Sequence, residues 1–157
     1  MNLYYYRLKI DPGFIHSDHA YQEYMRGDHH NKTWVDLGCG TNPFISEYKV
    51  NFNHAIGIDS DFHALRRAEK PACCADITQL PVKDESVDLT SSYMVFEHVT
   101  NPQSATNAIF RILRPGGMFI CCTVSRKYWV SRLNTVLNEQ VKKALLEGRP
   151  DYWVNIF

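Results

Sequence analysis

Three aspartates and two glycines are the residues of this sequence best suited to bind a small polar ligand. Gly38 and Gly40 are spaced by one residue shortly after Asp36, and Asp59 and Asp76 follow later. A Gly-x-Gly turn lets the backbone approach a ligand closely, because glycine has no Cβ and tolerates positive φ. A carboxylate roughly 20 residues beyond such a turn, the position of Asp59, can accept the hydroxyl protons of a ribose. A further carboxylate, Asp76, can accept a hydrogen bond from an exocyclic amine, so the pattern predicts a nucleotide-like ligand.

Apolar segments with strand character alternate along the chain with segments of helical character. We expect strands at residues 33–37, 55–58, 72–75, 87–91 and 118–124, and helices at residues 44–48, 62–68, 103–113 and 128–146. This alternation is typical of a parallel sheet with helices on its faces. The predicted fold class is therefore α/β, with a Rossmann-like, doubly wound, mostly parallel sheet flanked by helices. Since the strands of such a sheet end at one ligand crevice, the sheet brings the aspartates together.

The composition is that of one domain without a dedicated nucleic-acid surface. The chain has 157 residues, of which 45% are hydrophobic and 22% are charged, as in ordinary globular domains. Residues 1–110 hold nine basic and fourteen acidic residues, a net charge of −5, whereas residues 111–157 hold eight and three, a net charge of +5. This modest asymmetry argues against nucleic acid as the partner.

The cysteines and the N-terminus indicate a cytoplasmic protein. Five cysteines are present, an odd number without the Cys-x-x-Cys spacing of zinc or redox sites. Their apolar surroundings favour reduced, buried thiols. The chain does not start with a basic segment and an apolar core, and no apolar run approaches the roughly 20 residues needed to cross a bilayer. We therefore expect a cytoplasmic location and no membrane contact.

Five short segments lie at the ends of the predicted strands or lead into them. They are Val-Asp-Leu-Gly-Cys-Gly at 35–40, Gly-Ile-Asp at 57–59, Ala-Asp-Ile at 75–77, Ser-Val-Asp-Leu at 86–89 and Leu-Arg-Pro-Gly-Gly-Met at 113–118. In this order and at these spacings they resemble the class I S-adenosylmethionine-dependent methyltransferases, in particular a large group that acts on small molecules. The segment at 97–99, with Asn101 and Pro102, also looks like the one that follows strand four in that group. The resemblance covers about residues 34–124.

The resemblance implies S-adenosylmethionine as the cofactor and methyl transfer to a small-molecule oxygen, nitrogen or carbon nucleophile. It places the methionine end of the cofactor over the glycine turn, the ribose on Asp59 and the adenine beside Asp76. The full set of residues assigned to cofactor binding is Asp36, Gly38, Cys39, Gly40, Asp59, Ser60, Asp76, Ile77 and Tyr93. The cofactor carries a sulfonium and an amino group, so an acid at the end of the first strand suits it. The same acid would repel a pyrophosphate.

Two other functions stay open at this point. The first is a catalytically impaired or partner-dependent remnant that keeps the cofactor half of the fold. The second, less favoured, is an NAD-dependent oxidoreductase, because no substrate domain follows and Asn42 and Pro43 stand where a third glycine allows close packing of helix and strand. Asn tolerates left-handed φ, so the turn itself can survive this substitution. Pro fits the first turn of a helix.

His98 is the one side chain that we nominate as a catalytic general base. It follows the fourth strand at the crevice, and the ordinary pKa of histidine suits proton transfer at neutral pH. The competing interpretation is that Glu97 and His98 cap the next helix or bond to backbone groups.

We treat residues 1–157 as a single domain with three parts: an N-terminal lid or helical segment at 1–31, a cofactor-binding core at 32–124, and a C-terminal helix and tail at 125–157. His16, His19, His29 and His30 are residues of a type that binds metals, but their spacing is not diagnostic, so we assign no metal ligand and favour a solvated loop or helix that covers the crevice. The resembling family continues into two further strands, and this sequence has room for at most one of them. An uncovered fifth strand is a template for pairing, so we expect a homodimer or a partner subunit along that edge.

Overall fold

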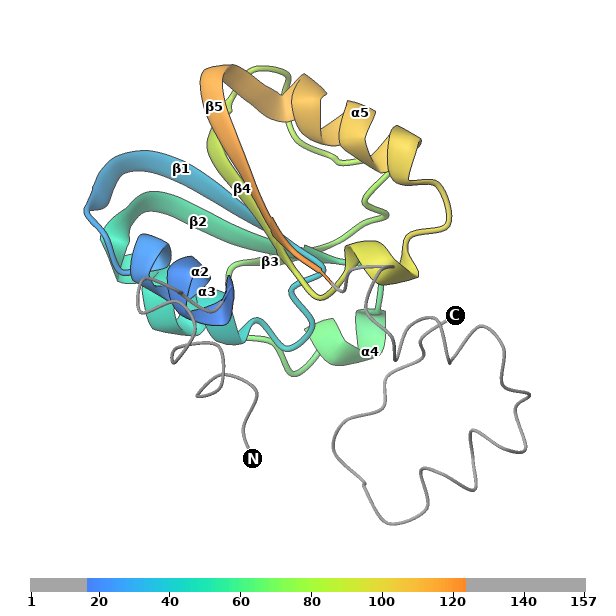
Figure 1. The fold of residues 1–157 in the computed structure, drawn as a ribbon. Coiled ribbons are helices and arrows are strands. Elements are labelled where there is room, and N and C mark those ends of the chain that lie inside the picture. The colour runs from blue at the N-terminus through green and yellow to red at the C-terminus, as the bar shows by residue number, and fades with distance from the viewer. Residues whose placement is uncertain (1–16, 124–157) are drawn as a thin grey trace, which may run out of the picture.

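A five-stranded sheet, parallel throughout, crosses the part of the chain that the structure describes, residues 17–123 (Figure 1). In this computed structural model the strand order is β3-β2-β1-β4-β5. The strands are β1 (His29–Leu37), β2 (Phe52–Asp59), β3 (Ala72–Cys74), β4 (Val87–Tyr93) and β5 (Leu113–Cys122). The chain builds from β1 first toward β3 and then toward β5, so the order reverses between β1 and β4, where doubly wound sheets bind ligands. The predicted α/β class with a Rossmann-like parallel sheet is confirmed.

Helices cover both faces of this sheet in the described range. α2 (Ser17–Met25) and α3 (Pro43–Tyr48) pack on one face, and α5 (Pro102–Ile112) packs on the other (Figure 1). The short α4 (Phe62–Leu65) and the 3₁₀ turns η1 (Lys49–Asn51) and η2 (Phe96–His98) lie in the connections. None of these helices has both the length and the apolar character needed to cross a membrane.

The alternation of side chains along β1 supplies both hydrophobic cores. Trp34 packs with Ile45 of α3 on one face of the sheet, whereas Val35 lies on the other face with Ile109 of α5. This alternation follows from the pleat of a strand, whose successive side chains point to opposite faces. Asp36 therefore shares the face of Trp34, beneath α2 and α3.

The start of β1 differs from the prediction. The strand begins at His29 rather than at residue 33, so His29 and His30 belong to the sheet and the loop or helix predicted for them is wrong. His29 is buried and its ring stacks on Phe52 of β2, with centroids 4.8 Å apart. Stacking between two strands draws a histidine into the sheet, and the local sequence around His29 gives no sign of it.

Other element boundaries also differ from the prediction, and the start of β5 moves by five residues. α4 ends at Leu65 instead of residue 68, and β5 begins at Leu113 because that residue pairs with Val87 before a register shift in the ladder. The predicted helix at 128–146 and the expected loss of the last one or two strands concern residues outside the described range.

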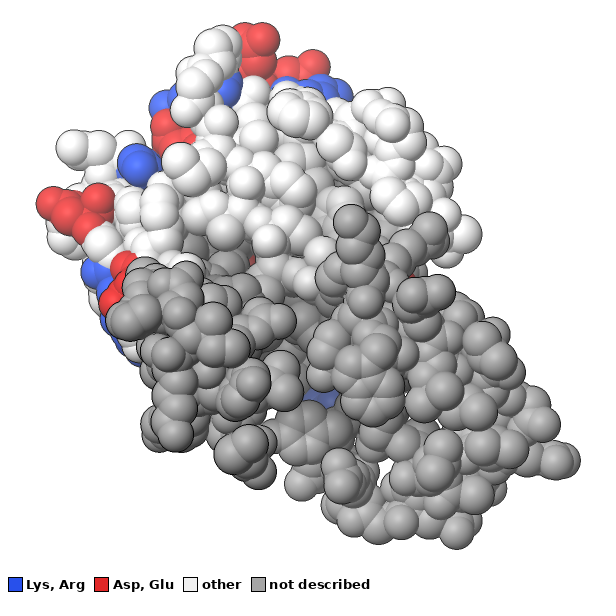
Figure 2. All heavy atoms as spheres, viewed as in Figure 1, with Lys and Arg blue, Asp and Glu red and all other residues white. Residues whose placement is uncertain are grey.

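Within the described residues, β3 and β5 form the two edges of the sheet. Met118 of β5 has an exposed side chain. On the face of the molecule seen in Figure 2, charged side chains of both signs lie along the upper and left edges of the described surface, and its centre is uncharged. The expected pairing of β5 with a second copy or a partner subunit stays a prediction.

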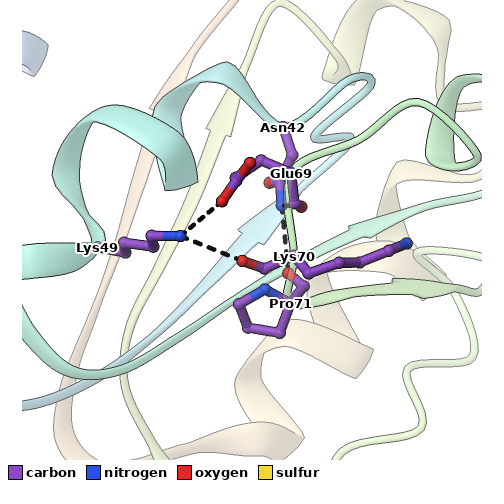
Figure 3. A network of polar contacts seen from close by, with 5 residues as sticks. All are labelled: Asn42, Lys49, Glu69, Lys70 and Pro71. Carbon is purple, nitrogen blue, oxygen red and sulfur yellow. Dashed lines mark hydrogen bonds and ion pairs between the residues drawn. The ribbon is translucent and has the colours of Figure 1, made fainter.

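Asn42 holds the turn after β1 against the connection between α4 and β3 (Figure 3). Its backbone has a left-handed φ of 68°, and its side chain is fully buried. The Nδ2 group donates to the carbonyl oxygens of Glu69 at 2.6 Å and Pro71 at 3.2 Å. Lys49 Nζ bonds to Glu69 Oε1 at 2.8 Å and to the Lys70 carbonyl oxygen at 3.3 Å. Asn42 thus adopts a positive φ that few residues with a side chain tolerate and makes two hydrogen bonds that glycine cannot make.

Asn42→Ala should lower the free energy of unfolding by about 2–4 kcal/mol, because alanine loses both hydrogen bonds and is strained at positive φ. Asn42→Gly should be about 1 kcal/mol less harmful, since glycine adopts the same φ without strain. Urea unfolding followed by circular dichroism measures both variants. An Asn42→Ala midpoint equal to that of the unmodified chain would refute this role.

Candidate functional site

A cleft of about 960 Å³ opens where β1, β2 and β4 end. Seven of the ten residues predicted from the sequence line it: Gly38, Gly40, Asp59, Ser60, Asp76, Ile77 and His98. Asp36, Cys39 and Tyr93 are not among its lining residues. The strand ends therefore bring most of the predicted residues together, as parallel topology requires.

The two glycines of the turn after β1 serve different purposes. Gly38 and Gly40 both have positive φ, of 72° and 55°. A Cβ on Gly38 would lie only 2.2 Å from Cγ2 of Val95, so packing against the segment after β4 requires glycine there. A Cβ on Gly40 would meet no described atom within 4 Å, and this residue lines the cleft. Gly40 therefore leaves space above the backbone for a ligand.

Asp59 at the end of β2 is held by two backbone N–H groups. Its Oδ2 accepts from Gly40 at 2.7 Å and its Oδ1 accepts from Asp61 at 2.7 Å. A carboxylate offers about four lone-pair positions, so both oxygens keep the capacity to accept further hydrogen bonds. The carboxylate is thus fixed in the cleft and remains able to receive two hydroxyl groups.

Asp76 is the second fixed carboxylate in the cleft. Its Oδ1 accepts hydrogen bonds from the Thr78 hydroxyl and the Thr78 N–H, both at 2.7 Å. These two bonds hold the pKa of Asp76 below its usual value, so the group is ionised at neutral pH. Oδ2 has no hydrogen-bond partner among the described residues and can accept one from an amine.

Asp36 lies on the face of the sheet that α2 and α3 cover, and its side chain is 2% exposed. Its Oδ1 accepts from the Ser91 hydroxyl at 2.7 Å, and Ser91 Oγ in turn accepts from Trp34 Nε1 at 2.7 Å. Burial raises the pKa of Asp36 to about 7, the Ser91 hydrogen bond opposes this rise, and the nearby charge of Asp59 adds to it. The structure therefore places Asp36 behind the glycine turn rather than in the cleft.

Cys39 and Tyr93 are also set back from the cleft. The Cys39 thiol is buried, and this burial, together with the charges of Asp36 and Asp59, raises its pKa to about 12, so the thiol is not a nucleophile at neutral pH. Tyr93 packs its ring against Phe44, with centroids 5.1 Å apart. Their assignment to cofactor binding stays a prediction.

His98 lies in η2, and its exposed side chain lines the cleft. The side chain that caps α5 is that of Asn101, which accepts from the Ser104 N–H at 3.0 Å. Glu97 instead accepts a hydrogen bond from the Thr123 hydroxyl at 2.6 Å. Neither Glu97 nor His98 provides the α5 cap, and the His98 ring is available to a ligand.

The cleft is acidic. Asp59, Asp61, Asp76 and Glu97 line it together with His98, and none of its described lining residues is Lys or Arg. Carboxylates at short range stabilise a positively charged ligand and repel a polyanion. The electrostatics of the described walls therefore favour a cationic ligand over a dinucleotide with a pyrophosphate.

Sequence reasoning placed His98 of the segment after β4 at the crevice but did not single out Val95. Met94 and Val95 line the cleft, and Met94 has a φ of 56°, which is uncommon for a residue with a side chain. Its N–H donates to the Cys122 carbonyl oxygen at 2.7 Å, which holds this turn against β5. A usable signal existed, because segments that follow parallel strands line the ligand crevice.

A family model described as a methyltransferase domain matches residues 35–121. The chain belongs to this family. The match covers the predicted segments from the glycine turn to β5, and the parallel sheet agrees with it. The resemblance to S-adenosylmethionine-dependent methyltransferases is confirmed.

Curated relatives of this methyltransferase domain carry different substrate names. A malonyl-[acyl-carrier protein] O-methyltransferase of Hamiltonella defensa is 31% identical over 107 residues, which cover 64% of this chain and 41% of the relative. A demethylmenaquinone methyltransferase of Streptomyces avermitilis is 25% identical over 131 residues, which cover 76% of this chain and 56% of the relative. The chain thus spans about half the length of the curated relatives it matches.

Solved structures share the fold of this methyltransferase domain. An S-adenosylmethionine-dependent methyltransferase from Mesorhizobium loti superposes with a TM-score of 0.61 at 24% identity, covering 69% of this chain and 54% of that one. A Haloferax volcanii methyltransferase in complex with the Trm112 methyltransferase activator gives a TM-score of 0.60 at 24% identity, covering 66% of this chain and 50% of that one.

The described residues of this methyltransferase domain fit S-adenosylmethionine, the cofactor of these methyltransferases. The carboxylate-lined cleft matches a ligand with a sulfonium and an amino group. Space above Gly40 admits a ligand close to the backbone. Asp59 and Asp76 hold oxygens ready for hydroxyl and amine donors.

The raised pKa of Asp36 predicts a pH-dependent stability. Because the folded state holds this proton more tightly, its contribution to the free energy of unfolding is lost progressively as pH rises from 3.8 to about 7. Asp36→Asn has no side chain that ionises at this position. Its free energy of unfolding relative to that of the unmodified chain should therefore increase by about 2–3 kcal/mol when the pH is raised from 5 to 8. Urea unfolding at both pH values measures the change. A difference between the two proteins that does not vary with pH would contradict the burial argument.

Proposed function

We propose that this chain carries out S-adenosylmethionine-dependent methyl transfer to a small-molecule oxygen, nitrogen or carbon nucleophile, in the cytoplasm. The observation that carries the proposal is the acidic cleft in which Gly40, Asp59 and Asp76 stand at the ends of successive strands. Family membership supports the reaction class. All five cysteines lie in the described range and none forms a disulfide, which agrees with a reducing compartment.

The geometry of the cleft walls supports the binding roles that we propose. Asp59, fixed by two N–H groups, accepts the ribose hydroxyls, and the free oxygen of Asp76 accepts the adenine amine while Ile77 packs beside the base. The turn of Gly38 and Gly40 carries the methionine end. Both glycines give the backbone the positive φ that brings it under the ligand.

Catalysis in this proposal depends chiefly on positioning. The bound cofactor supplies a methyl group already activated by the positive charge on sulfur. The protein then has to align the acceptor for in-line displacement, a task of orientation rather than of nucleophile activation by a triad. His98, exposed in the cleft after β4, is placed to take a proton from an acceptor that carries one.

The proposed methyl acceptor is a class of small molecules with an oxygen, nitrogen or carbon nucleophile. The names of the curated relatives include a malonyl group on acyl-carrier protein and demethylmenaquinone, so related domains are named for acceptors of different kinds. Residues around the cleft after β4, among them Met94 and Val99, supply apolar surface. A panel of small acceptors and carrier-bound acyl groups, assayed with radiolabelled methyl donor, distinguishes these classes.

A partner-dependent domain is the second candidate. The observation that favours it is that the Haloferax volcanii structure contains a methyltransferase activator protein. In the described range β5 offers an unpaired edge to such a partner. Cofactor binding without turnover by the chain alone, with turnover restored by a second protein, would favour this candidate.

The cofactor assignment is tested by calorimetric titration. S-adenosylmethionine should bind, and NAD should bind at least tenfold more weakly, because its pyrophosphate faces the carboxylates of the cleft. Tighter binding of NAD would sink the methyltransferase proposal in favour of an oxidoreductase.

Asp59→Ala should weaken S-adenosylmethionine binding by about 1–3 kcal/mol, roughly 5- to 150-fold in Kd, because it removes a charged acceptor and frees the Gly40 N–H. Asp28→Ala is the matched control, since Asp28 is exposed and lies outside the cleft. Calorimetry measures both variants, and circular dichroism checks that they fold. Equal affinity for Asp59→Ala and Asp28→Ala would remove Asp59 from the site.

A further inference from the structure

Asp36 is a buried acid whose environment offers no cation. Its carboxyl accepts a hydrogen bond from Ser91, and Ser91 accepts one from Trp34 in the same strand as Asp36. Among the described residues no Lys, Arg or His forms an ion pair with Asp36. A neutral hydroxyl is therefore its main support, and the ionised form is poorly stabilised.

The titratable groups around Asp36 are Tyr21 of α2, Cys39 of the glycine turn and Asp59 of β2. Burial first, and the charge of Asp36 second, raises the pKa of both Tyr21 and Cys39, so both keep their protons at neutral pH. Lys70 acts on Cys39 from the connection before β3 and only weakly offsets its shift. Asp36 is the member of this cluster that changes charge near neutral pH.

Asp36 is nevertheless within electrostatic reach of the cleft. Leu37 and Gly38, which follow it, line the cleft, and the charge of Asp59 on the cleft wall already raises its pKa. A negative charge at the wall therefore disfavours ionisation of Asp36. By the same coupling, a positive charge in the cleft favours it.

We propose that binding of S-adenosylmethionine makes Asp36 release its proton to solvent, so that cofactor binding and deprotonation of this acid are coupled. The inference rests on the proposed function. The positive charge that enters the cleft is balanced by the carboxylate that forms behind the glycine turn, and no other bond is made or broken. Because the bound state holds fewer protons than the free state, the cofactor binds more tightly as pH rises.

Calorimetry in buffers of different ionisation enthalpy counts the released protons. Titration of S-adenosylmethionine at pH 7 in phosphate, HEPES and Tris should give a slope of about half a proton for the unmodified chain, since Asp36 is about half protonated there. Asp36→Asn keeps an oxygen for the Ser91 hydroxyl and should release none. Between pH 6 and pH 8, the affinity of the unmodified chain should rise about tenfold more than that of Asp36→Asn. Both proteins meet the same cofactor ionisations, so the difference belongs to Asp36.

Two further measurements keep the test decisive if Asp36→Asn fails to fold. Ser91→Ala removes the donor that favours the ionised carboxyl, so the pH at which half of the protons are released should move upward. Infrared difference spectra of the unmodified chain should lose a protonated carboxyl band when S-adenosylmethionine is added. Measurable binding with no released proton, or equal release by Asp36→Asn, would overturn the coupling. A complete lack of binding would instead count against the proposed function.

Discussion

The hydrogen bond from the Gly40 N–H to Asp59 Oδ2, at 2.7 Å, is the interaction on which the cleft depends. It joins the turn after β1 to the end of β2, and both segments line the cleft. This bond and a second one, from the Asp61 N–H to the other oxygen of Asp59, together fix the orientation of the carboxylate. A charge-assisted bond to backbone donors is stronger than one between neutral groups, so the turn and the acid form one rigid unit.

Much of this arrangement could be predicted because its signals are local. An apolar segment that ends in an acid indicates the end of a parallel strand. This pattern was enough to predict that Asp59 and Asp76 lie at the same crevice. The positive φ of Asn42 also followed from residue type. The early start of β1 could not be predicted, since it depends on stacking between His29 and Phe52 of another strand. The motif pointed Asp36 at the ligand, whereas the pleat of β1 turned its side chain to the opposite face.

The charges on the described walls of the cleft favour a positively charged ligand. Carboxylates on the described walls face the ligand, and the buried Asp36 stands behind them without a cation of its own. The carboxylates repel one another, and a positively charged ligand in the cleft reduces this repulsion. The arrangement therefore suits a cationic ligand. The relatives' names differ in the acceptor and agree in the methyltransferase reaction. A common cofactor half with a variable acceptor half accounts for this pattern.

The contact between Gly38 and Val95 has a consequence for how this domain can vary. The side chain of Val95 occupies the space that any other residue at position 38 would need. A side chain at position 38 is therefore penalised twice, by the contact with Val95 and by the backbone strain that a φ of 72° imposes on most residues other than glycine. A smaller residue at position 95 relieves only the steric contact, so a redesign of the segment after β4 has to keep glycine at position 38.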